Sequence, residues 1–208
     1  MMKGTLAEVA GIFAGDGTLY RTNRSFVMEV RGHPDEDEYY RKYVAPFFSQ
    51  VLNSKLKIIK RNYKNSVLIG IRKCGKKVYN LFHIELGFPV GKKSRIVRIP
   101  NKILNSNNKL IWISYLRGVF DTDGSIDKRF IKKKYLQPFV SFTTVSEIHK
   151  NQIYNLLKKL DFNAWKEKYR VRIAGWSSVD RFFNLIKPHN NLRIDKWNEI
   201  LDMKAQVA

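Results

Sequence analysis

The sequence predicts an α+β protein built from two similar halves. A nine-residue run, VAGIFAGDG at residues 9–17, returns in related form as LRGVFDTDG at residues 116–124. After each copy, the hydrophobic patterning indicates two strands, a helix, two more strands and a closing helix. We therefore expect two pseudo-symmetric αββαββα halves with antiparallel sheets, and we expect the two repeated runs to pack together as helices at the centre.

Each repeated run is typical of a helix that packs closely on another helix. Small residues recur four positions apart, at Gly11 and Gly15 in the first copy and at Gly118 and Thr122 in the second. Side chains at this spacing share one helix face, and small ones let two backbones approach each other. Each copy ends in Asp-Gly, and glycine is the usual stop signal of a helix.

The elements between the repeated runs follow from local patterns. In the first half we expect strands at 18–20 and 25–30, a helix at 35–52, strands at 56–59 and 67–71, and a helix at 76–86. In the second half we expect strands at 125–126 and 139–143, a helix to residue 160 capped by Ser146, strands at 163–166 and 169–173, a helix from about residue 178, and a helical extension at 195–204.

The chain divides at a polar segment. Residues 87–108 are rich in Gly, Pro, Lys, Arg and Asn and predict a linker. Residues 1–86 then form the first half, and residues 109–208 form the second half with its C-terminal extension.

Composition points to an anionic partner inside a cell. The 39 Lys and Arg residues exceed the 18 Asp and Glu residues and give a formal net charge of +21, which favours a polyanion over any purely structural role. No basic amphipathic helix favours a membrane surface, and no apolar run is long enough to cross a bilayer. A single cysteine, Cys74, excludes an intrachain disulfide and predicts an intracellular location, cytoplasmic or organellar, over secretion.

The acids that end the two runs predict a metal site. If the helices pair, Asp16 and Asp123 lie side by side at two helix C-termini, where the macrodipole already places negative charge. Two unit charges ~4 Å apart at an effective dielectric of ~20 repel by roughly 4 kcal/mol. Oxygen ligands of this kind favour a hard cation such as Mg²⁺ over zinc.

These runs resemble the paired motifs of the LAGLIDADG homing endonucleases, in the single-chain, intron-encoded form that carries two copies. The resemblance rests on Ala10-Gly11 and Gly15-Asp16-Gly17 in the first copy, and on Leu116, Gly118 and Asp121-Thr122-Asp123-Gly124 in the second. It implies a saddle of two sheets on DNA and a Mg²⁺-dependent hydrolase, with Mn²⁺ or Ca²⁺ as substitutes for binding. The metal ligands it implies are Asp16, Asp123 and the backbone carbonyls of Gly15 and Thr122, whereas Asp121 is expected at the helix interface or as a cap.

The same resemblance implies a basic and a polar residue in each half that organise solvent at the scissile phosphates. For the first half, Lys76 or Lys73 is the candidate for the basic role and His33 for the polar one, with a loop cap as the alternative for His33. At the matching place in the second half stand Ser177 and Ser178, with Arg172 as the nearest basic side chain.

The expected DNA surface consists of basic residues on the strands and their loops. Alternation places Arg170 and Arg172 on one face of a strand and Val171 and Ile173 on the other. Arginine and lysine serve both phosphate positioning and guanine recognition. The predicted DNA-binding residues are Arg21, Arg24, Arg31, Lys55, Lys57, Lys60, Arg61, Arg72, Lys73, Arg129, Lys132, Lys133, Lys134, Lys166, Lys168, Arg170 and Arg172. For the linker residues Lys92, Lys93, Arg95 and Arg98, contact with phosphate and simple solvation stay equally open.

The predicted function is therefore a monomeric, site-specific endonuclease that cleaves both strands of a long asymmetric DNA target in intron homing. The alternatives are an RNA maturase that binds intron RNA and a DNA-binding regulator without cleavage. In each case binding should weaken by roughly 10³-fold or more between 50 and 200 mM salt if six or more phosphates are neutralised.

Overall fold

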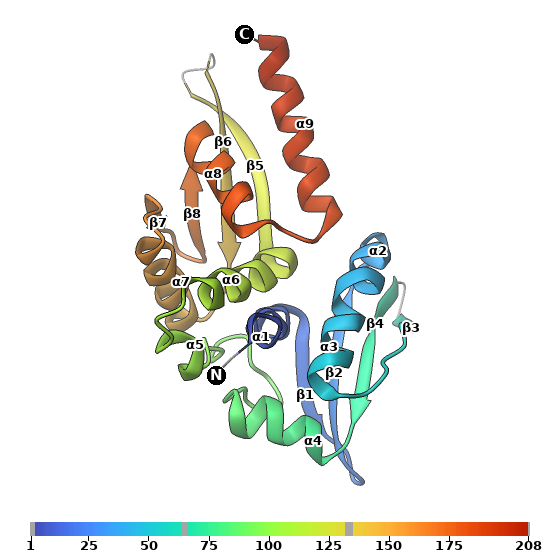
Figure 1. Ribbon diagram of the computed structural model, residues 1–208. Coiled ribbons are helices and arrows are strands. Elements are labelled where there is room, and N and C mark those ends of the chain that lie inside the picture. Colours follow the sequence, from blue (N-terminus) through green and yellow to red (C-terminus); the bar gives the residue numbers. More distant parts are fainter. Residues whose placement is uncertain (1–2, 64–65, 132–134, 208) are drawn as a thin grey trace.

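The computed structural model describes residues 3–63, 66–131 and 135–207, which form two halves that meet at a pair of central helices (Figure 1). Helix α1 spans Gly4–Asp16 and helix α6 spans Lys109–Asp123, so each repeated run supplies the C-terminal end of one of them. The two helices are in contact at the centre of the molecule, with one half on either side. The predicted helix pair is therefore present.

The elements of the first half follow the predicted order. After α1 come β1 (Gly17–Arg21) and β2 (Phe26–Gly32), then a helical stretch made of η1 (Pro34–Glu36), α2 (Asp37–Tyr39), η2 (Tyr40–Val44) and α3 (Ala45–Leu52). Strands β3 (Ile59–Tyr63) and β4 (Ser66–Cys74) follow, and α4 (Lys76–Tyr79) with η3 (Asn80–Glu85) closes this half.

The second half repeats this order. A short helix, α5 (Asn101–Leu104), precedes α6, and β5 (Gly124–Ile131), β6 (Tyr135–Thr143) and α7 (Glu147–Lys159) come next. Strands β7 (Ala164–Lys166) and β8 (Arg170–Ala174) lead to α8 (Trp176–Ile186) and to the C-terminal helix α9 (Asn191–Val207). The side chain of Ser146 accepts a hydrogen bond from the His149 N–H at 3.3 Å, which confirms the predicted cap of α7.

Each half holds one four-stranded antiparallel sheet, and the two sheets have equivalent strand orders. The order is β1-β2-β4-β3 in the first sheet and β5-β6-β8-β7 in the second. The glycine that follows each central helix pairs with a core residue, Val30 in the first sheet and Phe142 in the second. One position earlier, Glu29 in the first sheet therefore corresponds to Ser141 in the second.

Aromatic side chains join each central helix to the core of its own half. Phe13 of α1 stacks on Phe82 of η3 with ring centroids 4.2 Å apart, and Phe120 of α6 meets Phe182 of α8 edge to face at 4.8 Å. All four side chains are fully buried. Because Phe13 and Phe120 hold equivalent places in the repeated runs, the central helices belong to both the helix interface and the two cores.

Two elements of the first half differ from the prediction for local reasons. Strand β3 begins at Ile59 and not at Leu56, because the Leu56 N–H donates to Ser49 Oγ at 2.9 Å and belongs to the turn after α3. The helical stretch at 34–52 contains a π-helical turn, η2, immediately before α3. Pro46 lies in the first turn of α3 and has no N–H to donate to the preceding turn, which explains the wider turn there.

The C-terminal extension is one helix that starts four residues earlier than predicted. The Asn190 side chain accepts from the Leu192 N–H at 3.1 Å and caps α9 at its start. Figure 1 shows α9 running beside β5, and Trp197 stacks on Phe183 of α8 with centroids 5.2 Å apart. Within the described residues, no helix combines the length and the apolar character needed to cross a membrane.

Candidate functional site

The central helices approach each other so closely that glycine is required where they cross. A Cβ atom built on Gly11 would lie 2.2 Å from the Tyr115 carbonyl oxygen, and one on Gly118 would lie 2.3 Å from the Glu8 carbonyl oxygen. Both obstacles are backbone atoms of the opposite helix, so they cannot move aside without moving the helix. The predicted close contact at these glycines is confirmed, and it holds the C-terminal ends of α1 and α6 beside each other.

The last residue of each central helix is an aspartate, and the two carboxyl groups share one site. Burial raises the pKa of Asp16 to about 7, and the nearby charges of Asp123 and then Glu36 add to that rise. The Tyr40 hydroxyl donates to Asp16 Oδ2 at 3.4 Å. Near neutral pH and without a bound cation, Asp16 is therefore only partly ionised.

A lysine from the predicted linker reaches into this site. Lys93 Nζ donates to the carbonyl oxygens of Ala14 and Gly15, at 2.7 and 2.6 Å. Burial lowers the pKa of Lys93, while the charges of Asp123 and Asp16 oppose that effect. The sequence pattern leaves Lys93 open between phosphate contact and solvation, so its place beside the acids is new information from the fold.

Arg193 holds the matching place in the second half. Its Nη2 donates to the Thr122 carbonyl oxygen at 3.2 Å. Burial raises the pKa of Asp123, and the charges of Lys93 and Arg193 oppose that rise. The buried Nε of Arg193 has no acceptor among the described residues, which leaves a donor for a bound anion. The duplication itself is a signal for this pair, since each residue follows a proline after the closing helix of its half.

The donor atoms at the helix ends suit a hard divalent cation. Two carboxyl groups and two backbone carbonyls offer only oxygen, the ligand that Mg²⁺, Mn²⁺ and Ca²⁺ prefer. The carbonyls of Gly15 and Thr122, expected as ligands, accept hydrogen bonds from Lys93 and Arg193, and each carbonyl oxygen has a second lone pair for a cation. A Cβ on Gly15 would lie 2.1 Å from Thr122 Oγ1 and 3.2 Å from Asp123 Oδ2, so glycine leaves this space open.

Comparisons with known proteins agree with the repeated architecture. Residues 6–84 match the model of a WhiA LAGLIDADG-like domain, and residues 113–187 match the model of a LAGLIDADG-like domain. The chain carries two LAGLIDADG-like domains. The resemblance drawn from the two sequence motifs is thereby confirmed, although none of the curated proteins matches this chain in sequence.

Solved structures of single-chain homing endonucleases have the same arrangement of LAGLIDADG-like domains. A variant of I-DmoI superposes with a TM-score of 0.60 at 15% identity, covering 88% of each chain. I-WcaI, solved with its DNA recognition sequence, gives 0.58 at 14% identity over 91% of this chain and 83% of its own. I-SmaMI, solved with an uncleaved DNA target and calcium ions, gives 0.63 at 12% identity over 100% and 94%. The fold is therefore the homing endonuclease fold, as predicted.

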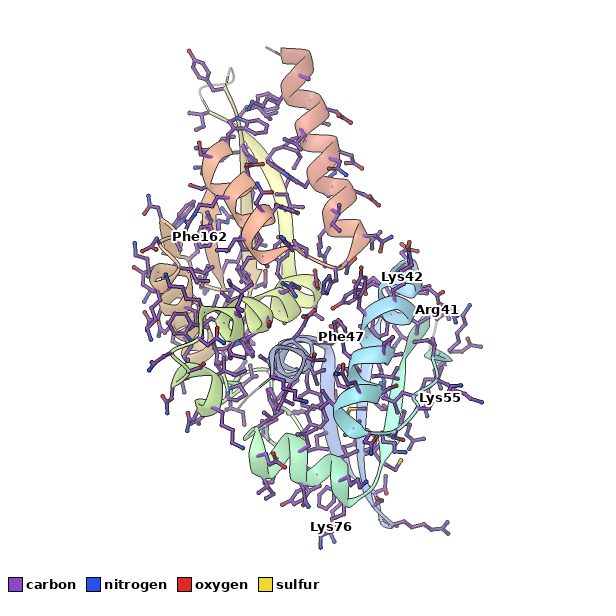
Figure 2. The ribbon with its side chains drawn as sticks, viewed as in Figure 1. Arg41, Lys42, Phe47, Lys55, Lys76 and Phe162 are labelled. Carbon is purple, nitrogen blue, oxygen red and sulfur yellow. The ribbon has the colours of Figure 1, made fainter. Side chains whose placement is uncertain are left out.

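Within the described residues, the hydrogen bonds of the predicted basic and polar catalytic candidates go to partners other than Asp16 and Asp123. Lys76 begins α4 at the outer end of the first half, far from the helix crossing (Figure 2). Lys73 faces the helix side of its sheet, where it donates to Ser54 Oγ at 2.7 Å. His33 caps η1, and its Nδ1 accepts a backbone N–H of the next turn at 3.4 Å. Lys93 is the basic side chain that lies at the end of α1 beside Asp16, because the chain after η3 turns back toward the helix ends.

The outer faces of the two sheets carry the arginines of the predicted DNA surface. Met28, Val30, Ile69 and Ile71 belong to the core, so two-residue alternation points their neighbours to the opposite face. The same alternation holds in the second sheet around Val171. The predicted residues on these outer faces are Arg31, Arg61, Arg72, Arg129, Arg170 and Arg172.

The other predicted DNA contacts are placed differently. Lys60 pairs with the core residue Ile69 and so falls on the helix side of β3, and Lys166 donates to Asn151 of α7 at 2.7 Å. Arg21 ends β1 with its guanidinium over the ring of Phe26, 5.8 Å from the centroid. Exposed in turns and loops are Arg24, Lys55, Lys57 and Lys168, with Lys55 labelled in Figure 2. Lys132, Lys133 and Lys134 lie outside the described residues.

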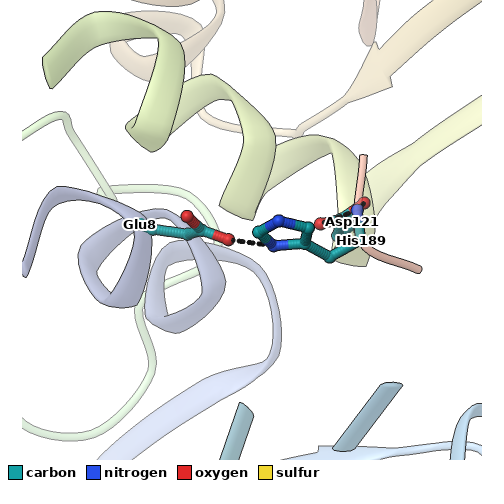
Figure 3. A group of neighbouring side chains, drawn as sticks. All are labelled: Glu8, Asp121 and His189. Atoms are coloured by element: carbon teal, nitrogen blue, oxygen red, sulfur yellow. Dashed lines mark hydrogen bonds and ion pairs between the residues drawn. The ribbon is translucent and has the colours of Figure 1, made fainter. Parts of the chain in front are cut away.

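A second cluster ties the two LAGLIDADG halves together beside the helix crossing (Figure 3). Glu8 Oε1 contacts His189 Nδ1 at 2.7 Å, and Glu8 Oε2 accepts from Arg117 Nη1 at 3.0 Å. Asp121 accepts from the backbone N–H groups of His189 and Asn190 at 3.0 to 3.2 Å, and burial raises its pKa to about 7. Glu8, Asp121 and His189 are residue types that hold metals, yet each carboxylate oxygen already has a donor. The cluster is therefore a clamp between the halves, and Asp121 has the interface and capping position expected of it.

Proposed function

We propose that this chain is a divalent-metal-dependent endonuclease that cuts both strands of double-stranded DNA at a specific, asymmetric site. The observation that carries the proposal is the meeting of Asp16 and Asp123 at the ends of two close-packed helices, one from each half. A twofold arrangement supplies one acid for each DNA strand. Divergence between the halves, with Lys93 on one side and Arg193 on the other, supports an asymmetric target.

In this proposal the acidic and the basic residues of the site have different roles. A cation held by Asp16 and Asp123 would supply Lewis acidity at the scissile phosphates. Lys93 and Arg193 bring positive charge to the same place and can stabilise the negative charge that a phosphodiester gains as water attacks it. The buried, unpaired Nε of Arg193 is suited to donate to a phosphate oxygen.

The proposal keeps the predicted division of the chain. Residues 1–86 and 109–208 each supply one acid and one basic sheet face, and residues 87–108 join them and supply Lys93. One chain thus holds a complete site, which supports action as a monomer.

The proposal is tested by selecting a target and then cutting it. Duplexes with a randomised segment are selected for binding in Ca²⁺, cloned into a plasmid and incubated with the protein in Mg²⁺. We expect linear plasmid, no product in EDTA, and a loss of roughly 100-fold or more in cleavage rate for Asp16→Asn and Asp123→Asn with binding retained. Asp202→Asn, an exposed position on α9, is the matched control and should cut normally. Undiminished cutting by the double variant Asp16→Asn, Asp123→Asn would contradict the proposal.

A second candidate is sequence-specific DNA binding without cleavage. One observation favours it: Lys93 donates to the Gly15 carbonyl oxygen and already brings a positive charge into the acidic site. The same assay separates the candidates, since a selected duplex that is bound in Mg²⁺ but never cut supports the regulator. A splicing assay on precursor RNA tests the remaining alternative, an RNA maturase.

A further inference from the structure

The outer face of the first sheet carries one buried acid among three arginines. Pairing places Glu29 of β2 opposite Arg72 of β4, and the same face presents Arg31 of β2 and Arg61 of β3. The Glu29 side chain is 1% exposed, although it lies on the outer face of the sheet. A buried carboxylate on a surface otherwise suited to a polyanion calls for a reason, since it weakens attraction for phosphate.

All three arginines converge on this carboxylate. Glu29 Oε1 accepts from Arg61 Nη1 at 3.0 Å and lies 3.3 Å from Arg72 Nε, and Glu29 Oε2 accepts from Arg31 Nη2. Each arginine is held through one nitrogen, and its side chain remains 36 to 45% exposed, so part of it is still open to a partner. A guanidinium has five N–H donors in a fixed fork, and holding one edge aims the others.

The described residues of the second sheet show no equivalent of the contact between Glu29 and its three arginines. The position equivalent to Glu29 is Ser141, whose hydroxyl shares a hydrogen bond of 2.7 Å with Ser125. Arg172, the counterpart of Arg72, pairs instead with Glu167 at 2.9 Å and lies over the ring of Phe139. The two sheets therefore present different donor patterns, and among the residues that the structure describes three arginines meet at one carboxylate in the first sheet alone.

We propose that Glu29 is a positioning residue that holds Arg31, Arg61 and Arg72 for reading guanine edges in the major groove and keeps them off the phosphates. Arginine forks match the O6 and N7 acceptors of guanine, whereas phosphate contact by the same side chains carries no sequence information. A fixed negative charge at the centre of the cluster disfavours phosphate there. The inference rests on the proposed DNA recognition and adds its chemistry: guanines in the half-site that faces the first sheet.

The test compares base preferences of wild type, Glu29→Gln and Asp202→Asn by sequencing duplexes selected from a randomised pool in Ca²⁺. Asp202→Asn removes the same charge from an exposed position of α9, outside both sheets, and is the matched control. For Glu29→Gln we expect the ratio of target to random-duplex affinity to fall about tenfold or more, with guanine preference lost in one contiguous half of the site. Asp202→Asn should keep the wild-type preference.

The variant Arg61→Gln distinguishes lost positioning of the arginines from a general folding defect in Glu29→Gln. If Glu29 acts through the arginines, Arg61→Gln loses preference at some of the same positions, and the double variant loses little more than the worse single variant. A wild-type preference retained in full by Glu29→Gln overturns the inference alone. A wild type that selects no sequence at all overturns the proposed function and the inference with it.

Discussion

Substitution of Gly11 by alanine at the helix crossing should destabilise the protein well beyond an ordinary surface change. The new Cβ would lie 2.2 Å from the Tyr115 carbonyl oxygen, so the helices must separate by about 1.2 Å to reach ordinary contact at 3.4 Å. Overpacking of this kind costs about 1–3 kcal/mol or more, and alanine returns about 1 kcal/mol through its better helix propensity. We take about 2 kcal/mol as the net loss, which for a chain of this length lowers Tm by roughly 4–8 °C.

The assay is thermal unfolding of Gly11→Ala beside Gly4→Ala in the same helix. A Cβ on Gly4 meets only Ser114 Oγ, at 3.2 Å, and that hydroxyl can rotate, so Gly4→Ala should stay within about 0.5 kcal/mol of wild type. The double variant Gly11→Ala, Gly118→Ala should lose less than the sum of the single losses, because one separation of the helices relieves both contacts. If Gly11→Ala melts within about 2 °C of Gly4→Ala, the glycine contact does not set the helix spacing.

The remaining predictions concern the acids and their neighbours. Lys93→Met should slow single-turnover cleavage of a selected duplex by roughly 100-fold, whereas the rate of Lys92→Met should stay within about threefold of wild type. Equal losses of rate in the two variants would contradict a specific role for Lys93 in cleavage. In EDTA, Asp16 has a pKa of about 7 in the folded protein, whereas an aspartate in the unfolded chain has a pKa near 4. The contribution of Asp16 to the free energy of unfolding is therefore fully present below about pH 4, and it is lost as the pH rises toward 7. Asp16→Asn should therefore gain in Tm over wild type from pH 5 to pH 8, by less than the equivalent of about 4 kcal/mol because Asp16 is partly exposed. Ca²⁺, which favours the ionised carboxylate, should shrink that gain; a gain that is constant with pH would contradict the role of burial.

Features that depend on neighbouring positions are the ones that the sequence predicts well. The spacing of Gly11 and Gly15, the cap at Ser146 and the alternation of Arg170 and Arg172 each follow from a few consecutive residues. The duplication extends these local patterns to the whole fold. Alternation also explains the helix-side placement of Lys73, since it follows Arg72 directly and the two must point to opposite faces.

Features that depend on the path of the chain are the ones that pattern alone does not reveal. Lys93 lies 77 positions after Asp16 and reaches it only because the segment after η3 folds back. The contact between Glu8 and His189 joins residues 181 positions apart. In the sequence, Glu29 has the pattern of an ordinary outward-facing strand residue. Its contacts with Arg61 and Arg72 depend on the pairing of β2 with β4 and of β4 with β3, which the local pattern does not predict.

The clamp at the helix crossing limits how the two halves can be recombined. Glu8 and Glu36 belong to the N-terminal half, but the donors that satisfy them, Arg117, His189 and Asn190, belong to the C-terminal half. A hybrid that grafts one half onto a foreign partner would leave Glu8 without Arg117 and His189, and Glu36 with only the His33 N–H of its own half, unless the donors travel with the graft. Engineering of new specificities by exchange of halves should therefore transplant the clamp together with the sheet.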